Sequence, residues 1–163
     1  MLLLATAILT GFGCTGCGGS SKPQASADWQ TVRGPGFSFQ APAGWKLERA
    51  KNRLSATRDT ELVQVAVFPL QKPYDGKLFD RVARELRVRM RQLAGQTGGR
   101  LSGERTVTAD GIRSHAYDVE AGDHLDEYTF VLSGLREYLL LCRRSSSGEA
   151  EPCGRLVESF ARL

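Results

Sequence analysis

The sequence lacks the short motifs that mark common hydrolases and metal sites. Its 163 residues include only two histidines, and they contain neither a G-x-S-x-G elbow nor an H-E-x-x-H pattern. No apolar stretch reaches the roughly 20 residues that a membrane-spanning helix requires, and no internal repeat is present. These absences leave a hydrolase, a metalloenzyme, a membrane-spanning protein or a repeat protein without direct support from sequence motifs.

Charge is missing from the first part of the chain, where no charged residue precedes Lys22. Residues 2–12 form an uncharged apolar run whose length suits the hydrophobic region of an export signal. The run ends in small residues before cysteine. This resembles the lipobox of bacterial lipoproteins, in which the cysteine is acylated and becomes the mature N-terminus. We expect lipidation at Cys17, which follows Thr15 and Gly16, with Cys14 as the alternative.

The leader departs from the usual export signal because no Lys or Arg stands between Met1 and the apolar run. A cleaved secretory signal without lipid, a buried N-terminal segment and a start upstream of Met1 therefore stay open. The main prediction is a signal peptide and lipobox over 1–17, a flexible tether over 18–28 and a single domain over 29–163. Such a protein is extracytoplasmic and held at a bacterial cell membrane by acyl chains such as palmitate, with secretion as the alternative.

No cofactor is predicted. Residues 11–16 fit the G-x-G-x-x-G pattern, but a Gly/Ser-rich tether follows where a dinucleotide site needs a helix. The formal charge of +4 lies entirely after the leader. Because export argues against nucleic acid as a partner, we expect the membrane, an envelope protein or an anionic envelope polymer instead.

Cys142 and Cys153 are the only cysteines of the predicted domain. An even pair in an exported protein favours a disulfide. Closing this loop of about a dozen residues would stabilise the fold by roughly 3 kcal/mol on the chain-entropy model. Free thiols or a metal site are the alternatives.

Hydrophobic periodicity predicts strands, one long helix, a second group of strands and a short terminal helix. The long helix covers 77–96 with one buried face, and Asp75 is its expected N-cap. The predicted strands are 37–40, 45–47, 54–57, 62–68, 101–108, 112–120, 127–133 and 137–143, and the terminal helix is 152–163. Tight turns such as Asp110-Gly111 make the later strands antiparallel. We expect an α+β domain in which an antiparallel sheet of about six to seven strands is covered by both helices.

Two short patterns resemble the PsbP-like superfamily, which is named for an extrinsic protein of photosystem II, and its small bacterial lipoproteins. The first is GFSFQAPAGW at 36–45, where a strand leads into a proline and a Gly-Trp pair. The second is the strand at 138–142 followed by Cys153 and by Ser159-Phe160 in the last helix. This resemblance covers most of 29–163 and implies a layered α+β sandwich. It also implies a non-enzymatic role in binding, docking or assembly, and it transfers no functional residue.

Arginines crowd the predicted long helix. Arg84, Arg87 and Arg91 fall along one flank and outnumber their acidic neighbours, which makes them a candidate binding stripe for anionic lipid or an anionic polymer. The alternative is an ordinary solvated helix face. The i,i+4 spacing also predicts two ion pairs on this helix, Asp80–Arg84 and Glu85–Arg89.

One cluster combines histidines with carboxylates: His115, Asp118, Asp123, His124 and Asp126. A metal site needs three or four ligands at fixed distances, and no short-range ligand motif is present, so we predict no metal. Catalytic groups can still assemble from distant positions. The main prediction is therefore a non-catalytic binding or assembly module, and a small cell-envelope hydrolase is the alternative.

Overall fold

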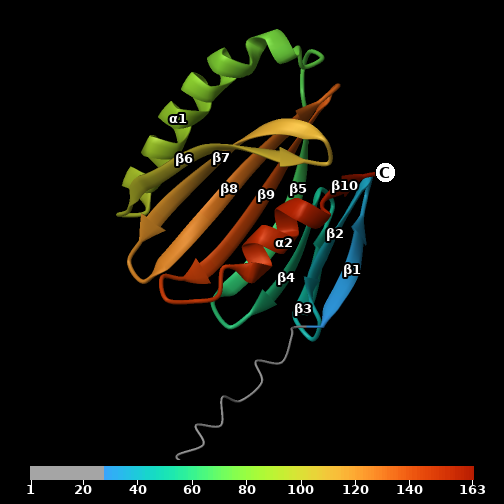
Figure 1. Ribbon diagram of the computed structural model, residues 1–163, viewed down its shortest axis with the longest axis vertical. Coiled ribbons are helices and arrows are strands. Elements are labelled where there is room, and N and C mark those ends of the chain that lie inside the picture. The colour runs from blue at the N-terminus through green and yellow to red at the C-terminus, as the bar shows by residue number, and fades with distance from the viewer. Residues whose placement is uncertain (1–27) are drawn as a thin grey trace, which may run out of the picture.

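The computed structural model describes residues 28–163, so the predicted signal peptide, both candidate lipidation cysteines and nearly all of the predicted tether lie outside the described residues. The described residues form ten strands, two α-helices and one 3-10 turn (Figure 1). The strands are β1 Trp29–Gly34, β2 Phe37–Pro42, β3 Lys46–Ala50, β4 Arg53–Arg58, β5 Glu61–Pro69, β6 Arg100–Ala109, β7 Ile112–Ala121, β8 His124–Ser133, β9 Arg136–Ser145 and β10 Ala161–Arg162. The helices are the 3-10 turn η1 Gly76–Leu78, α1 Phe79–Gln96 and α2 Glu151–Ser159.

These strands form two antiparallel sheets. The large sheet has seven strands in the order β3-β4-β5-β9-β8-β7-β6, and the small sheet consists of β1, β2 and β10 with β2 in the middle. The predicted α+β class with a large antiparallel sheet, a long helix and a short terminal helix is confirmed. The first predicted strand, 37–40, belongs to the small sheet rather than to the large one, and β1 was not predicted.

Helix α1 packs on one face of the large sheet, over β6 and β7. Its buried residues Leu86, Met90 and Ala94 follow the spacing of one helix face and contact a cluster that includes Tyr117. Tyr117 is fully buried, and its hydroxyl donates a hydrogen bond of 2.9 Å to the carbonyl of Ala83. Burial raises the pKa of Tyr117 to about 12, so the hydroxyl remains a donor that ties α1 to β7.

The small sheet and α2 cover the other face of the large sheet and enclose the larger hydrophobic core. Phe37 and Phe39 of β2 are fully buried in it, together with Leu156 of α2. The ring of Tyr138 in β9 meets that of Phe160 edge-on at 5.4 Å. Neither helix of residues 28–163 is long and apolar enough to cross a membrane.

The chain after α2 departs from the predicted helix, which was expected to run to 163. Helix α2 ends at Ser159, because Phe160 adopts extended backbone angles (φ −60°, ψ 130°). Ala161 and Arg162 then pair with the free edge of β2, and the amide of Leu163 donates to the carbonyl of Gly36 at 3.1 Å. The edge of β2 thus offers main-chain partners that end the helix.

The beginning of α1 and its ion pairs also differ in detail from the prediction. The carboxylate of Asp75 accepts a hydrogen bond from the amide of Lys77 at 2.9 Å and so caps the 3-10 turn that leads into α1. Glu85 pairs with Arg81 at 3.3 Å. The two predicted pairs, Asp80–Arg84 and Glu85–Arg89, are absent from residues 28–163. Glu85 has an arginine four residues before it and another four residues after it, and it contacts the earlier one.

The predicted disulfide is present. Cys142 of β9 and Cys153 in the first turn of α2 are bonded, with their Cα atoms 5.3 Å apart, and both residues are buried. The bond fastens α2 to the large sheet across an exposed loop. A helix of nine residues would be marginal in water without such support.

Replacing both cysteines by alanine (Cys142→Ala with Cys153→Ala) should lower the free energy of unfolding by roughly 2–4 kcal/mol, measured by urea unfolding without reductant. A reductant should destabilise the parent protein and leave the double variant unchanged. The parent for this test carries Cys14→Ala and Cys17→Ala, so that only the two domain cysteines are counted. Two reactive thiols in that parent, denatured without reductant after recovery from an oxidising compartment, would contradict the bond.

Candidate binding cleft

The turns of the described domain gather at two opposite ends, because neighbouring strands run antiparallel along a shared axis (Figure 1). The entry end is where β1 begins at Trp29, beside the turns at 43–45, 59–60 and 122–123. The cleft end holds the turns at 35–36, 51–52 and 134–135, together with Leu163. The six residues of β1 carry the chain from the first end towards the second.

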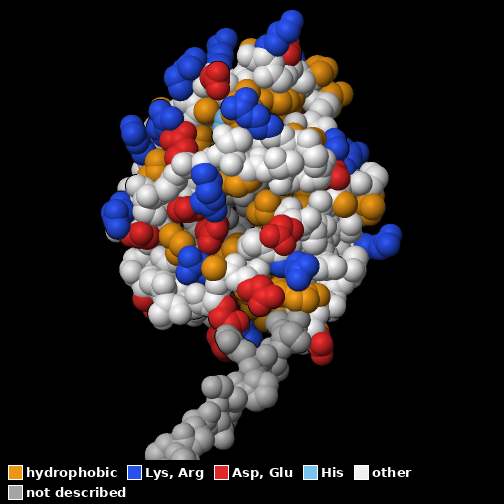
Figure 2. Space-filling view, viewed as in Figure 1, with side chains coloured by type: hydrophobic (Ala, Val, Ile, Leu, Met, Phe, Trp, Pro, Cys, Tyr) orange, Lys and Arg blue, Asp and Glu red, His pale blue; other side chains and the backbone are white. Residues whose placement is uncertain are grey.

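Exposed charges without an ion pair lie at both ends of the described domain. At the entry end Asp28, Asp59 and Glu151 are exposed and make no ion pair within residues 28–163, and at the cleft end the same holds for Lys51 and Arg136. Figure 2 shows Lys and Arg side chains projecting at the upper end of the molecule with a few Asp and Glu side chains among them, and side chains of both signs near the lower end. The exposed cations Lys51 and Arg136 thus lie at the end away from the point where the chain enters the domain, and we call this the basic end.

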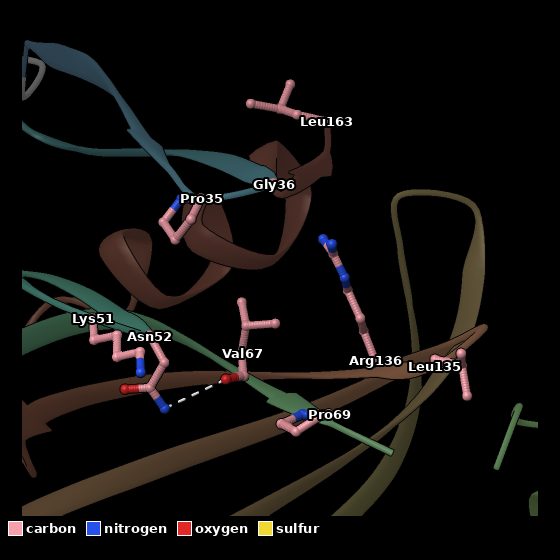
Figure 3. Close-up of a pocket in the computed structure, with 9 residues that line it drawn as sticks. All are labelled: Pro35, Gly36, Lys51, Asn52, Val67, Pro69, Leu135, Arg136 and Leu163. Carbon is pink, nitrogen blue, oxygen red and sulfur yellow. Dashed lines mark hydrogen bonds between the residues drawn. The ribbon is translucent and has the colours of Figure 1, made fainter. Parts of the chain in front are cut away.

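A cleft of about 600 Å³ lies at this basic end, within the size range of small-ligand pockets. Residues from both sheets line it: Pro35, Gly36, Lys51, Asn52, Val67, Pro69, Leu135, Arg136 and Leu163. Two of these side chains are cationic, none is acidic, and the others are mostly apolar. Figure 3 shows Arg136 and Val67 pointing into the space between the turn at 35–36 and the strands of the large sheet.

Gly36 makes room for the Arg136 guanidinium. It follows Pro35 in the tight turn between β1 and β2, and its φ of +81° is one that L-residues rarely adopt. A Cβ placed on Gly36 would lie 2.5 Å from Nη1 of Arg136. The turn thus needs glycine for its backbone angle, and the arginine occupies the space that a side chain would take.

Main-chain hydrogen bonds hold the walls of the cleft. The amide of Val67 donates to the carbonyl of Asn52 at 2.8 Å, and the amide of Leu70 donates to the carbonyl of Leu135, also at 2.8 Å. The Asn52 side chain donates a further bond to the carbonyl of Val67. These bonds fix the walls relative to one another, which lowers the entropic cost of binding.

The predicted arginine stripe is reduced by one member. Both nitrogens of the Arg87 fork bind Glu104 of β6, at 2.6 and 2.8 Å. The two groups are partly exposed, and the pair fastens the flank of α1 to the sheet. Arg84 and Arg91 are exposed and have no ion pair within the described chain, so two of the three arginines remain available to an anion.

The histidine and carboxylate cluster is not one site. His115 and His124 lie near opposite ends of the β7–β8 pair, roughly 20 Å apart at about 3.4 Å per residue. Asp126 pairs with Arg143, and Asp118 with Arg105. No group of three potential ligands in residues 28–163 is placed to hold a metal ion.

His115 is buried, and its Nε2 lies 3.1 Å from the carbonyl oxygen of Phe79. Its ring stacks on that of Phe79 at 3.8 Å, and the Arg113 guanidinium lies 3.9 Å from the centre of the Phe79 ring. Within residues 28–163 no histidine is hydrogen-bonded to a serine or a buried carboxylate. His115 also lines a pocket of about 450 Å³ together with Asp80 and Glu104, and the non-catalytic role stays a prediction.

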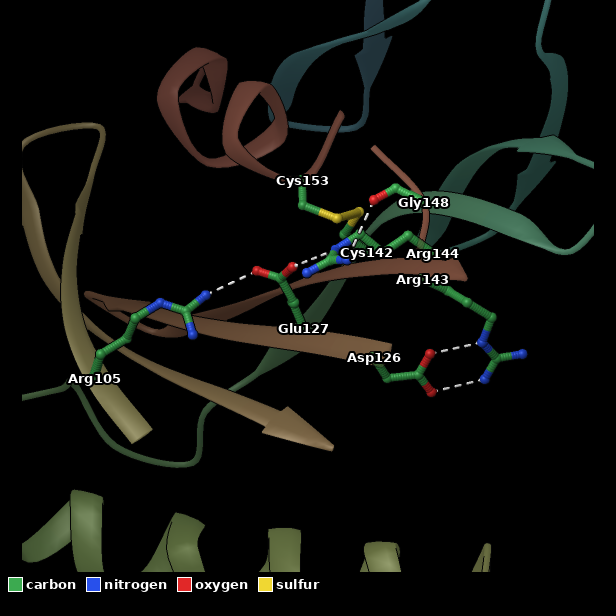
Figure 4. The surroundings of a disulfide bond; sticks show 8 residues. All are labelled: Arg105, Asp126, Glu127, Cys142, Arg143, Arg144, Gly148 and Cys153. Atoms are coloured by element: carbon green, nitrogen blue, oxygen red, sulfur yellow. Dashed lines mark hydrogen bonds and ion pairs between the residues drawn. A yellow bond between two sulfur atoms is a disulfide. The ribbon is translucent and has the colours of Figure 1, made fainter. Parts of the chain in front are cut away.

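Cross-strand ion pairs surround the disulfide (Figure 4). Asp126 is buried and receives two bonds from Arg143, at 2.6 and 2.8 Å. Glu127, the next residue, bridges Arg105 at 2.8 Å and Arg144 at 3.2 Å. These acids are matched by cations of the fold itself, so we assign them a structural role.

Sequence patterns did not indicate the cleft. Its residues come from segments up to 128 positions apart, Pro35 to Leu163, and no single segment contains a binding motif. The Pro35-Gly36 dipeptide was the one local signal, since it marks a tight turn. It does not reveal which other turns lie beside it.

Comparison with known proteins shows the class of fold. No protein-family model matches the chain, and no curated protein sequence matches it. Among solved structures, the chain is similar to cyanobacterial PsbP (CyanoP) from Synechocystis sp. PCC 6803, with a TM-score of 0.64 and 15% identity over 89% of this chain and 98% of that one. A structure from Bacteroides thetaiotaomicron VPI-5482 matches at a TM-score of 0.49 with 13% identity, over 82% of this chain and 48% of that one. The fold is PsbP-like, as the sequence patterns predicted.

The environment of His115 predicts how stability depends on pH. Burial lowers the pKa of His115, and Arg113 acts in the same direction, against the Phe79 carbonyl, Glu104 and Asp80. The unfolded chain then takes up this proton at a higher pH than the folded protein does. The stability that His115 contributes is thus present above about pH 6.5 and is lost as the pH falls towards the lowered folded value.

We expect His115→Gln to reduce the loss of unfolding free energy between about pH 7.5 and about pH 5.5, measured by urea unfolding. The parent protein, unfolded under the same conditions, is the reference. An equal pH dependence in the His115→Gln variant and the parent would contradict this account.

Proposed function

We propose that this protein is an extracytoplasmic lipoprotein that acts as a non-catalytic binding or assembly module of the bacterial cell envelope. Acylation of Cys17, or of Cys14, would hold it at the membrane. The lipobox-like leader supports the anchor. The observation that carries the binding role is the position of the cleft, with Lys51 and Arg136 in its lining, at the end opposite to the point where the chain enters the domain.

This arrangement suits a tethered module. An anchor would reach the domain through Trp29 at the entry end, so the point of attachment lies at the end opposite to the cleft. The cleft is therefore not covered by the attachment itself, and another envelope component can reach it.

A second candidate function is binding of anionic lipid or an anionic polymer through α1. The exposed positions of Arg84 and Arg91 favour it, because neither side chain is occupied by an acid of the described chain. The pairing of Arg87 with Glu104 weakens it. Loss of vesicle binding in Arg84→Ala/Arg91→Ala, with Arg81→Ala unchanged, would favour this candidate.

The anchor can be tested by fractionating cells that express Cys17→Ala, Cys14→Ala or both. Cys17→Ala should move the protein from the membrane to the soluble fraction, and Cys14→Ala alone should leave it in place. Globomycin, which blocks processing of lipoprotein signals, should cause accumulation of the precursor. Membrane association that persists in the double variant would rule out the lipid anchor.

A further inference from the structure

We propose that the cleft at the basic end binds an acidic peptide segment of a partner protein. A carboxylate of the segment would lie between Lys51 and Arg136, and a neighbouring aliphatic side chain would contact Val67 and the adjacent apolar wall. This inference names the partner chemistry for the site of the proposed function and rests on that function. It concerns a different part of the chain from the anchor and is tested separately.

The charges of the cleft fit a carboxylate. Several arginines of the described chain form an ion pair with an acid of the same chain, among them Arg58, Arg105, Arg143 and Arg162. Arg136 instead faces Gly36, and no residue that lines the cleft is acidic. An arginine fork binds a carboxylate with two parallel hydrogen bonds, and an added lysine contributes a second positive charge.

The apolar lining favours a peptide over a small inorganic anion. Val67, Pro35 and Pro69 form part of the wall, and Leu135 and Leu163 are 54% and 66% exposed at its edge. A mostly apolar lining with a few charged groups is typical of ligand-binding pockets. A segment that alternates acidic and aliphatic residues would meet both features.

The shape of the cleft fits a segment rather than a folded surface. Three turns from two sheets meet around a space of about 600 Å³, and main-chain hydrogen bonds hold its walls. Such a space accommodates a few side chains.

The test uses the full chain, purified in a mild detergent, and two fluorescein-labelled hexapeptides. One alternates leucine with aspartate, and the other replaces each aspartate by asparagine. Fluorescence anisotropy should show binding of the acidic peptide alone, weakening as salt is raised. Arg136→Ala and Lys51→Ala should each weaken it roughly tenfold, since a hydrogen bond to a charged group contributes about that factor.

A charge-reversal variant provides a second test of the same site. Arg136→Glu should abolish binding of the acidic peptide and introduce binding of a peptide that alternates leucine with lysine. Arg81→Ala removes an exposed arginine outside the cleft, so it is the matched control and should bind as the parent does. Each variant should unfold at the parent's temperature, because the replaced side chains are exposed.

Absence of acidic-peptide binding by the parent, or equal binding by parent, Arg136→Ala and Lys51→Ala, would overturn the inference. Binding to anionic vesicles that both substitutions abolish, without peptide binding, would also overturn it and identify a lipid surface instead. If the cysteine variants stay in the membrane fraction while the parent binds the acidic peptide, the anchor is refuted and the cleft assignment stands.

Discussion

Two phenylalanines of β2, Phe37 and Phe39, pack across the inner face of the large sheet, and the other parts of the domain are arranged around that contact. Both are fully buried against residues of β5 and β9. Burial of each side chain contributes about 2 kcal/mol. Because β2 is held there, β1 and β10 can pair with its two edges, and α2 fills the remaining part of the inner face.

The cleft depends on the same contact. The turn at 35–36 belongs to the small sheet, whereas the turns at 51–52 and 134–135 belong to the large one. They meet only because the packing of β2 fixes the two sheets relative to each other. The site therefore has no motif of its own, and its geometry follows from the register of β2 with its neighbours.

Sequence patterns predicted the parts of the fold in which local and tertiary preferences agree. The buried face of α1 and the tight turns of the later strands are signals of this kind, and the pairing of Cys142 with Cys153 follows from the export context. The strand β10 was missed because two residues carry no periodicity, and its pairing depends on an edge that forms elsewhere. The pairing of Arg87 with Glu104 could not be predicted, because it depends on where β6 lies against the helix and the sequence of the helix carries no information on that.

Arg143 and Arg144 are neighbours in β9, yet their side chains leave opposite faces of the sheet and meet different acids of β8, Asp126 and Glu127. A slip of one residue between these strands would move every side chain to the other face. In one direction of slip the neighbouring arginine would stand opposite each acid, so the ion pairs alone do not fix the register. The apolar residues of the shifted strand would change faces as well, and the cores on the two sides of the sheet therefore fix the alignment.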